Sequence, residues 1–472
     1  MPALIGRNQE ICKLDDFYNS GRPELVIVYG RRRVGKTFLI REHFKNKFAF
    51  YFTGSLNVPN TVNLAHFDSA IVEYGGTSLK PSKNWTEAFE KLRSLLSKNA
   101  GHRKLVFIDE MPWLDAQKSN FLASFDYFWN SWASANSDIL FIGCGSATSW
   151  ITKHIFKNKG GLHNRITGRI NLSPFSIGEC EQFFNSRDVV ITRYQLAECY
   201  MIFGGIPYYL NLFDRSLSFS QNVDRLCFSS NAPLKNEFEE LYFSLYKNPD
   251  RHIKIVQTLA SKHSGLNRAE LSATGNLLQN GHLTQALREL EECDFIESFS
   301  DFTKKANGAY YYLKDPFTLF YLRFMKSNNT KDEYFWTNYI DDGGHRAWSG
   351  FSFELLCRIH IRQIKIKLGI HGVSTNTTSW RSKGVTPGAQ IDLVISRKDG
   401  VINLCEVKYS KHPYEITKSY AGELERKKSV FSMETGSRQA LHTTMITTYG
   451  VARKGYFTMA QSEVSLDDLF VL

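Results

Sequence analysis

Two acidic residues and one lysine near the end of the chain have the spacing of a metal-dependent site for phosphodiester chemistry. Residues 387–410 read PGAQIDLVISRKDGVINLCEVKYS, in which the turn SRKDG separates two apolar strands. Pairing of these strands as a hairpin would place Asp392 beside Glu406. Lys408 would share a face with Glu406, because alternate residues of a strand point to the same side. Two carboxylates can hold a divalent cation that stabilises charge during in-line attack, and the lysine can position or activate water.

A helix carrying an acidic residue precedes this hairpin. In residues 348–364, WSGFSFELLCRIHIRQI, apolar side chains recur at helical spacing and Glu354 lies among them. Residues 350–472 also contain 17 Lys and Arg against 11 Asp and Glu, an excess that favours a polyanionic partner. A Glu-x-Lys alternation alone is often a surface ion pair. The upstream Asp392, the apolar strands and the basic excess are what favour a metal site here.

A second kind of chemistry is indicated near the start of the chain. Residues 24–44, ELVIVYGRRRVGKTFLIREHF, predict a buried strand, a glycine loop and a helix. The loop has the full GxxxxGK[ST] pattern of a phosphate-binding P-loop, whose backbone N–H groups surround phosphates at the positive end of a helix. Lys36 would reach the terminal phosphates and Thr37 would ligate Mg²⁺. The loop residues expected to bind nucleotide are Gly30, Arg33, Gly35, Lys36 and Thr37.

An acidic pair ends the next buried strand that the sequence predicts. The segment KLVFIDEMPWLD has four apolar residues followed by Asp109 and Glu110, which is the pattern of a Walker B strand in a parallel sheet. Asp109 would hold Mg²⁺ through its second shell, and Glu110 would orient or deprotonate the attacking water. A short apolar run followed by Asp-Glu is common, but its spacing from the P-loop favours a Walker B motif here.

Polar residues after two further predicted strands are candidate sensors of the nucleotide. In DILFIGCGSATSWI, Ser146 or Thr148 could contact the terminal phosphate, although a serine that caps the next helix fits equally well. In GGLHNRITGRINLSPFS, Arg165 or Arg169 could be an arginine finger, although solvated arginines are common.

These segments occur in the order typical of one family. ALIGRNQEI, the P-loop, FIDEMPWL, the Arg165 segment and FGGIPYYL resemble successive motifs of archaeal-type AAA+/STAND ATPases over residues 1–225. The resemblance implies that Gly6 and Arg7 lie near the adenine and that Pro207, in a helical lid, reports the nucleotide state. Ser146 departs from the family, in which a more polar sensor such as Asn is expected.

The middle of the chain resembles a winged helix. Residues 251–313 predict three helices followed by a two-stranded hairpin around the polar segment DFTKKANG. The third helix would then present four side chains to the major groove of DNA: His282, Thr284, Gln285 and Arg288. Acidic residues on the same helix favour the alternative, in which this domain docks a protein or another part of the chain.

The last third resembles the DUF234-type, PD-(D/E)xK nuclease-like domain that follows the winged helix in such ATPases. The resemblance implies that Asp392 and Glu406 bind Mg²⁺, that Glu354 completes the metal shell and that Lys408 is catalytic. The proline that precedes the aspartate in the motif is replaced here by Ile391. Three basic residues, Arg426, Lys427 and Lys428, are candidates for contact with the phosphate backbone.

These readings predict a multi-domain α/β protein. The expected parts are a P-loop ATPase of AAA+ type with a parallel sheet, a helical lid, a winged helix and a C-terminal α/β restriction-endonuclease-like domain. Their predicted boundaries are residues 1–180, 181–248, 249–325 and 326–472.

The amino-acid composition is that of an ordinary globular protein, and the net charge favours a polyanionic partner. The chain has 42% hydrophobic and 22% charged residues, no apolar run of transmembrane length and no signal segment at its start. Its eight cysteines lack metal-ligand spacing, as is usual in a reducing compartment, and the cytoplasm is expected. A net charge of +11 favours nucleic acid, and DNA in particular, as the partner. A homo-oligomer would arise if Arg165 acts on a neighbouring subunit.

The combined expectation is an ATP-dependent protein that controls a Mg²⁺-dependent DNA nuclease. The alternative is a signalling ATPase, a nucleotide switch whose C-terminal domain binds DNA or protein without cleaving. A membrane transport ATPase is disfavoured, because the sequence has neither an apolar span nor an LSGGQ signature.

Overall fold

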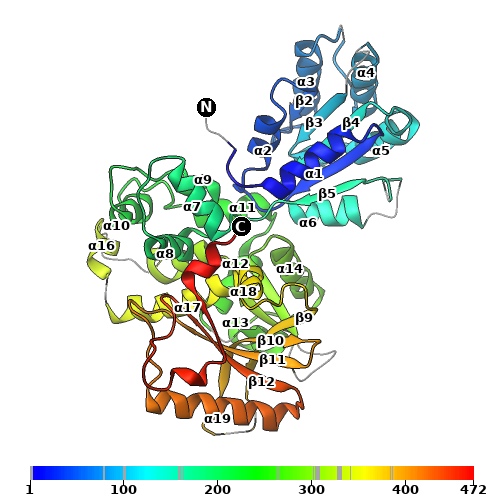
Figure 1. Ribbon diagram of the computed structural model, residues 1–472. Coiled ribbons are helices and arrows are strands. Elements are labelled where there is room, and N and C mark those ends of the chain that lie inside the picture. Colours follow the sequence, from blue (N-terminus) through cyan, green and yellow to red (C-terminus); the bar gives the residue numbers. More distant parts are fainter. Residues whose placement is uncertain are drawn as a thin grey trace. The chain divides into compact units, whose positions relative to one another are not determined.

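The structure is a computed structural model, and its chain divides into two compact units, residues 1–173 and 174–472 (Figure 1). It describes residues 4–77, 80–98, 103–157, 161–162, 164–262, 265–300, 302, 309–326, 332–340, 342–382, 384 and 386–472. No helix within these ranges combines the length and the apolar character needed to cross a membrane.

The first unit is built on a five-stranded sheet in which all neighbouring strands run parallel, in the order β2-β3-β4-β1-β5. Its strands are β1 (Glu24–Tyr29), β2 (Phe48–Thr53), β3 (Lys104–Asp109), β4 (Ile139–Gly145) and β5 (Gly168–Asn171). The helices are α1 (Asn8–Asn19), α2 (Lys36–His43), α3 (Asn60–Glu73), α4 (Trp85–Lys98), α5 (Phe121–Ser131) and the short α6 (Thr148–Trp150). Such a sheet needs crossover helices on its faces, which explains the continuous burial of β3 and β4.

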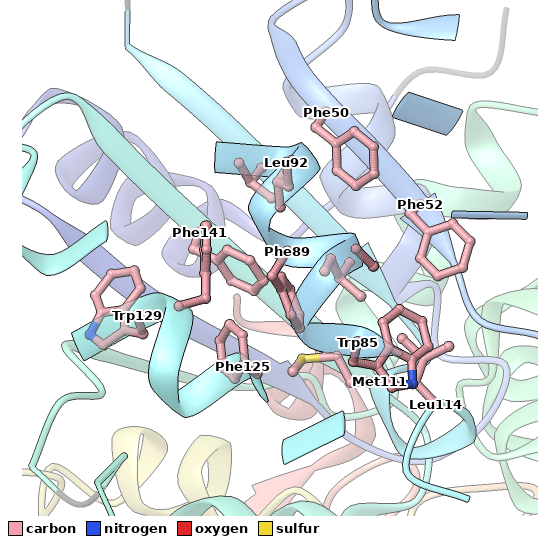
Figure 2. Close-up of a cluster of buried hydrophobic side chains, with 14 of the residues drawn as sticks. Phe50, Phe52, Trp85, Phe89, Leu92, Met111, Leu114, Phe125, Trp129 and Phe141 are labelled. Atoms are coloured by element: carbon pink, nitrogen blue, oxygen red, sulfur yellow. The ribbon is translucent and has the colours of Figure 1, made fainter. Parts of the chain in front are cut away.

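Aromatic side chains fill the space between the sheet and helices α3, α4 and α5 (Figure 2). Trp85 is fully buried, meets Phe67 and Phe121 edge to face, and donates its indole N–H to Asn60 at 2.8 Å. Edge-to-face packing of this kind suits the charge distribution of aromatic rings. This core fixes the strands whose ends carry the nucleotide motifs.

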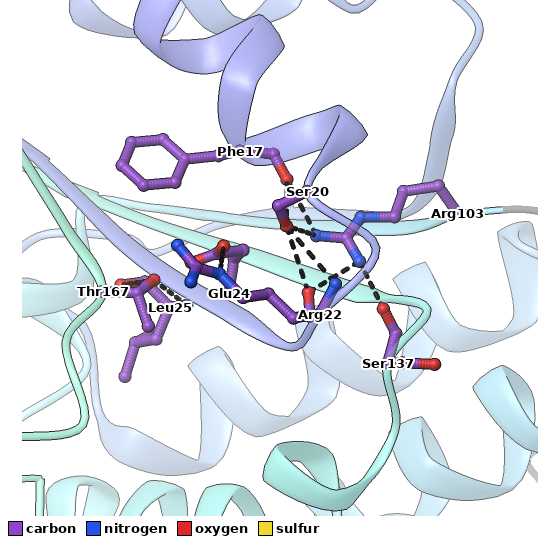
Figure 3. A network of polar contacts seen from close by, with 8 residues as sticks. All are labelled: Phe17, Ser20, Arg22, Glu24, Leu25, Arg103, Ser137 and Thr167. Atoms are coloured by element: carbon purple, nitrogen blue, oxygen red, sulfur yellow. Dashed lines mark hydrogen bonds and ion pairs between the residues drawn. The ribbon is translucent and has the colours of Figure 1, made fainter.

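A polar network joins the segments at the amino ends of these strands (Figure 3). The Arg103 guanidinium donates to the carbonyl oxygens of Phe17, Arg22 and Ser137 at 2.8, 2.8 and 2.5 Å. Burial lowers the pKa of Arg103, yet guanidinium groups stay charged in proteins. The arginine therefore ties the end of α1 to the segments before β1 and β4, at the amino ends of the strands.

The second unit begins with a helical segment, residues 177–245. Its helices are α7 (Ile177–Asn185), α8 (Arg193–Phe203), α9 (Pro207–Leu210), α10 (Phe219–Val223) and α11 (Glu237–Leu245). Ser176, Thr192 and Ser218 each form a capping box that starts a helix. Gly204 ends α8 in the left-handed conformation, with φ of 64°, as helix C-caps favour.

The next segment has the element order of a winged helix. It contains α12 (Asp250–Ala260), β6 (Leu266–Asn267), α13 (Arg268–Gly275), α14 (Gly281–Glu292), β7 (Ile296–Ser300) and β8 (Ala309–Leu313). The three strands pair antiparallel in the order β6-β8-β7. Of the predicted polar hairpin tip, residues 301 and 303–308 lie outside the described residues.

The last segment holds a mixed five-stranded sheet in the order β13-β12-β11-β10-β9. Its strands are β9 (Thr375–Arg381), β10 (Gln390–Arg397), β11 (Val401–Lys408), β12 (Ala440–Thr447) and β13 (Ser462–Ser465). The helices of this last segment are α15 (Pro316–Phe320), α16 (Phe335–Tyr339), α17 (Gly343–Ile359), α18 (Ile361–Lys367) and α19 (Lys418–Thr435). Strands β10 and β11 are antiparallel, as the predicted hairpin requires, whereas β11 and β12 are parallel across α19.

A buried histidine joins the first and last segments of this unit. The ring of His360, at the end of α17, accepts the backbone N–H of Ile177 at Nε2 and contacts the carbonyl oxygen of Leu356 through Nδ1, each at 2.9 Å. Because Nε2 accepts, the imidazole is neutral with its proton on Nδ1. Burial lowers its pKa from 6.5 to about 4.

This histidine predicts a pH-dependent stability for the second unit. Because protonation of His360 is disfavoured in the folded state, its contribution to the free energy of unfolding is complete above pH 6.5. This contribution is lost as the pH falls toward 4, by about 3 kcal/mol at pH 4. Urea unfolding at pH 7 and pH 4 should show a smaller loss in His360→Gln than in the parent. Replacement of the exposed His371 by Gln should leave the loss unchanged. Equal losses in all three proteins would contradict this assignment.

Candidate nucleotide site and candidate nuclease site

The P-loop connects β1 to α2 and has the backbone conformation that its glycines allow. Gly30 has φ of 144°, and a Cβ there would lie 2.3 Å from the carbonyl oxygen of Leu172, so no larger residue fits. Gly35 has φ of 90° and caps α2, and Arg33 is itself left-handed, with φ of 71°. The loop thus carries its backbone N–H groups to the start of α2, where phosphates bind in such loops.

The two polar side chains that end the motif occupy defined positions. The ammonium of Lys36 is buried and donates to the carbonyl oxygens of Gly30 and Arg31, both at 2.9 Å. The hydroxyl of Thr37 donates to Oδ2 of Asp109 at 2.6 Å. A hydroxyl and a carboxylate are hard oxygen donors, which suit Mg²⁺. This hydrogen bond brings together two sequence motifs that lie 72 residues apart.

Register explains this meeting. Tyr29 at the end of β1 pairs with Gly145 at the end of β4, and Ile108 of β3 pairs with Gly143 of β4. The carboxyl ends of β1, β3 and β4 therefore lie at one edge of the sheet, where open α/β folds bind their ligands.

Glu110 and Ser146 are brought together at this edge. Ser146 donates both its backbone N–H and its hydroxyl to Oε2 of Glu110, at 3.1 and 3.0 Å. Burial raises the pKa of Glu110, the neighbouring Lys36 lowers it and the Asp109 carboxylate raises it, with a net increase. Glu110 also has a left-handed backbone, with φ of 50°. The direct partner of Ser146 is thus the acidic residue, which the sequence did not indicate.

The other predicted nucleotide residues lie in different surroundings. Gly6 has φ of 64°, and the Arg7 guanidinium donates to the carbonyl oxygens of Val34 and Ser173 at 3.2 and 2.7 Å, so it ties the N-terminal segment to the P-loop backbone. Arg165 is exposed in a turn before β5, and no contact among the described residues links it to the P-loop. Pro207 is the first residue of α9 and belongs to the second unit.

The C-terminal residues form a second cluster around β10 and β11. Asp392 accepts the backbone N–H of Val407 at 3.0 Å, which binds its carboxylate to the strand that carries Glu406. Glu406 is 2% exposed, and the ammonium of Lys408 lies 3.9 Å from its Oε2. Helix α17, which carries Glu354, packs on β11, and burial and then the Asp392 carboxylate raise the pKa of Glu354 to about 8. The four predicted side chains are therefore close enough to interact.

Two residues of α19 complete this cluster and were not predicted for it. Lys427 places its ammonium 2.6 Å from Oε2 of Glu406, and the hydroxyl of Tyr420 donates to the same oxygen at 3.0 Å. Arg426 instead donates to the carbonyl oxygens of Pro387 and Gly388. Of the three basic residues expected to contact a phosphate backbone, the first two are thus engaged within the protein.

The cluster partly fits a divalent cation. Oε1 of Glu406 is buried and has no hydrogen-bond partner among the residues that the structure describes, although a buried carboxylate oxygen needs one. Together with Asp392 it offers hard oxygen ligands of the kind that Mg²⁺ takes. Within the described residues, however, no group of three or more His, Cys, Asp and Glu side chains is arranged to hold a metal ion.

The third helix of the winged-helix segment has an exposed polar face. His282, Thr284, Gln285 and Arg288 of α14 are all exposed, as predicted. The hairpin is engaged within the protein: the Tyr312 hydroxyl is 2.5 Å from the Ser379 hydroxyl of β9, and Phe302 packs on Phe431 of α19. The helix face is therefore available to a partner, while the hairpin packs on the C-terminal sheet.

Comparison with known proteins shows that residues 4–213 are similar to a family of ATPase domains. A model described as an ATPase domain predominantly from Archaea matches residues 4–213. An uncharacterized protein of Methanocaldococcus jannaschii is 25% identical over 437 residues, which cover 91% of this chain and 93% of that protein. An uncharacterized ATP-binding protein of the same organism is 44% identical over 44 residues, 9% of this chain and 75% of its own.

Among solved structures, the Walker-type ATPase of Pyrococcus abyssi resembles this chain. The alignment covers 68% of this chain and 96% of that one, at 18% identity and a TM-score of 0.50. Identity at this level speaks to fold alone. It agrees with the α/β fold class that the sequence predicts, in which a parallel P-loop sheet is accompanied by helices and a separate mixed sheet.

Proposed function

We propose that this protein binds and hydrolyses ATP to control a Mg²⁺-dependent DNA nuclease in its C-terminal segment, because residues 4–213 match the model of an ATPase domain predominantly from Archaea. The observation that carries the nuclease half is the buried Glu406 carboxylate with its unpartnered Oε1, beside Asp392 and Lys408.

The nucleotide half assigns a role to each group at the carboxyl edge of the first sheet. Lys36 and the P-loop N–H groups, with Gly30, Arg33 and Gly35 shaping the loop, would bind the phosphates. Thr37 and Asp109 would hold Mg²⁺, which neutralises charge on the phosphates when bound. Glu110 would orient the attacking water, and Ser146 would hold Glu110 in place through its two hydrogen bonds.

Placement of Gly6 and Arg7 near the adenine, of Arg165 as an arginine finger and of Pro207 as a reporter of the nucleotide state remains part of this proposal. An Arg165 that acts between subunits would require a homo-oligomer.

The nuclease half assigns metal binding to Asp392 and Glu406, with Glu354 beside them, and the positioning of water to Lys408. The fold supports it, since α17 with its acidic Glu354 precedes the antiparallel strands β10 and β11, which carry Asp392 and Glu406, as the PD-(D/E)xK pattern requires. A bound Mg²⁺ would supply charge stabilisation at the scissile phosphate. The basic excess of this segment and the exposed face of α14 favour DNA as substrate.

The helical segment after the ATPase core offers a route for control. His345 of α17 contacts Glu198 of α8 through Nε2 at 2.9 Å, and both side chains are nearly buried. Tyr194 of α8 stacks on Tyr409, the residue after Lys408, with ring centroids 5.1 Å apart. A displacement of α8 would therefore be transmitted to the elements that carry Glu354 and Lys408. Such a coupling is a free energy shared by two sites.

The decisive experiment is cleavage of plasmid and single-stranded DNA by the purified protein, with Mg²⁺ or Mn²⁺ and with or without ATP. We expect metal-dependent cleavage that falls on the order of 10²-fold in Lys408→Ala, because a residue that positions or activates water is lost. Lys398→Ala, in the β10–β11 turn, is the matched control and should cut at the parental rate. No cleavage under any condition, with ATP hydrolysis intact, would overturn the nuclease.

One observation favours a second function. The Lys427 ammonium lies 2.6 Å from Oε2 of Glu406 and already compensates the charge of that carboxylate. A C-terminal domain that binds DNA or protein without cutting would agree with this, and the protein would then be a nucleotide switch. The cleavage experiment separates the two functions.

A further inference from the structure

One oxygen atom of Glu406 is held by two side chains of the same helix. The Lys427 ammonium lies 2.6 Å from Oε2 and the Tyr420 hydroxyl 3.0 Å from it. The side chains of Lys427 and Glu406 are only 12% and 3% exposed, so water screens this ion pair weakly. Lys408, the lysine of the motif, is farther from the same oxygen at 3.9 Å and is 30% exposed.

The position of Lys427 conflicts with a cation at Glu406. A divalent cation bound by this carboxylate would lie within a few ångströms of the ammonium, and their repulsion is strong where water is excluded. Of the two Glu406 oxygens, only Oε1 lacks a partner. The side chain of Lys427 is long and flexible, and Glu423, one turn earlier, already lies 3.8 Å from its ammonium. Movement of the ammonium away from Oε2 therefore leaves it near another carboxylate.

We propose that Lys427 is a built-in counter-ion of the candidate nuclease site, which a divalent cation must displace from Glu406 in order to bind. The proposal rests on the proposed nuclease function and adds a regulatory residue to it. A nucleic acid phosphate in the site gives the displaced ammonium a new partner, so metal and nucleic acid strengthen each other's binding. Lys427 is a positioning residue that keeps metal affinity low until a polyanion is present.

The test is Mn²⁺ binding to the full-length protein without nucleotide, followed by the electron paramagnetic resonance signal of free Mn²⁺. Lys427→Met should bind Mn²⁺ about tenfold more tightly than the parent, which corresponds to roughly 1.4 kcal/mol. Lys418→Met removes the same charge from the exposed first residue of α19 and should leave Mn²⁺ binding at the parental affinity. Glu406→Gln defines the Mn²⁺ that binds elsewhere. Lys427→Gln, which keeps a hydrogen-bond donor without the charge, should match Lys427→Met and guards against a packing defect.

A second measurement probes the coupling to nucleic acid. A single-stranded oligonucleotide should tighten Mn²⁺ binding in the parent and have little effect in Lys427→Met, with Lys408→Ala present in both proteins to keep the oligonucleotide intact. Equal Mn²⁺ affinities in the parent, Lys427→Met and Lys427→Gln would overturn the counter-ion role while leaving the nuclease standing. Absence of Glu406-dependent Mn²⁺ binding from every variant would overturn the metal site itself, and the proposed nuclease with it.

Discussion

Replacement of Glu110 by Gln is expected to lower the rate of ATP hydrolysis on the order of 10³-fold while ATP binding is retained. Glutamine preserves the shape of the side chain and can still accept the two hydrogen bonds from Ser146. It cannot take a proton from water, and it removes the negative charge near Lys36 that would orient the nucleophile. Steady-state phosphate release and equilibrium binding of a fluorescent ATP analogue measure the two effects separately.

The matched control for this change is Glu90→Gln, an exposed glutamate of α4 that lies outside the P-loop edge. It should hydrolyse ATP at the parental rate. Hydrolysis that survives in Glu110→Gln would show that the water is oriented by another group. A parallel loss of ATP binding would instead assign Glu110 to the architecture of the loop.

The nucleotide motifs were predictable because their geometry is local or is dictated by sheet topology. The P-loop needs only its own glycines and the helix that follows, and both are visible in GRRRVGKT. Asp109 reaches Thr37 because both follow strands of one parallel sheet, whose carboxyl ends must meet. The contact between Ser146 and Glu110 depends on side-chain conformation at the ends of two strands, which a strand pattern does not specify.

The contact of Lys427 with Glu406 was not predicted from the sequence. The sequence makes the basic residues of ERKKS candidates for contact with a phosphate backbone. Four residues of α19, however, recur at helical spacing and share one face of the helix: Tyr420, Leu424, Lys427 and Phe431. Leu424 and Phe431 are buried, and that face therefore packs on the protein. The amphipathic period could have placed Lys427 inward. Its pairing with Glu406 needed in addition the packing of α19, which only the three-dimensional structure supplies.

The hairpin that carries the candidate nuclease residues lies between these cases. Its turn and the antiparallel pairing of β10 with β11 follow from the alternation of apolar residues around SRKDG. The approach of Glu354 does not, since α17 precedes the hairpin and its position depends on the tertiary fold. Burial of Glu354 and Glu406, and then the charge of Asp392, raise the pKa values of both carboxyl groups.

Asp392→Asn is expected to reduce DNA cleavage on the order of 10³-fold without unfolding the protein. The asparagine side-chain oxygen can still accept the N–H of Val407, so the contact between β10 and β11 is preserved. What disappears is one of the two negative charges that would hold the cation, and with it the stabilisation of the attacked phosphate. Glu406-dependent Mn²⁺ binding should weaken in the same variant, and thermal unfolding should be nearly unchanged.

Asp399→Asn provides the comparison, because this aspartate lies in the exposed turn of the same hairpin and pairs with Arg397. It should cut DNA and bind Mn²⁺ as the parent does. If Asp392→Asn cleaves DNA at the parental rate, the Asp392 carboxylate does not bind a catalytic metal and only holds β10 against β11. The cleavage would then have to take place at a different site. If Asp392→Asn loses both cleavage and Mn²⁺ binding while Asp399→Asn keeps both, the two carboxylates Asp392 and Glu406 act together in binding the metal. The hydrogen bond from Val407 to residue 392 does not require a negative charge, so its loss would not explain that result.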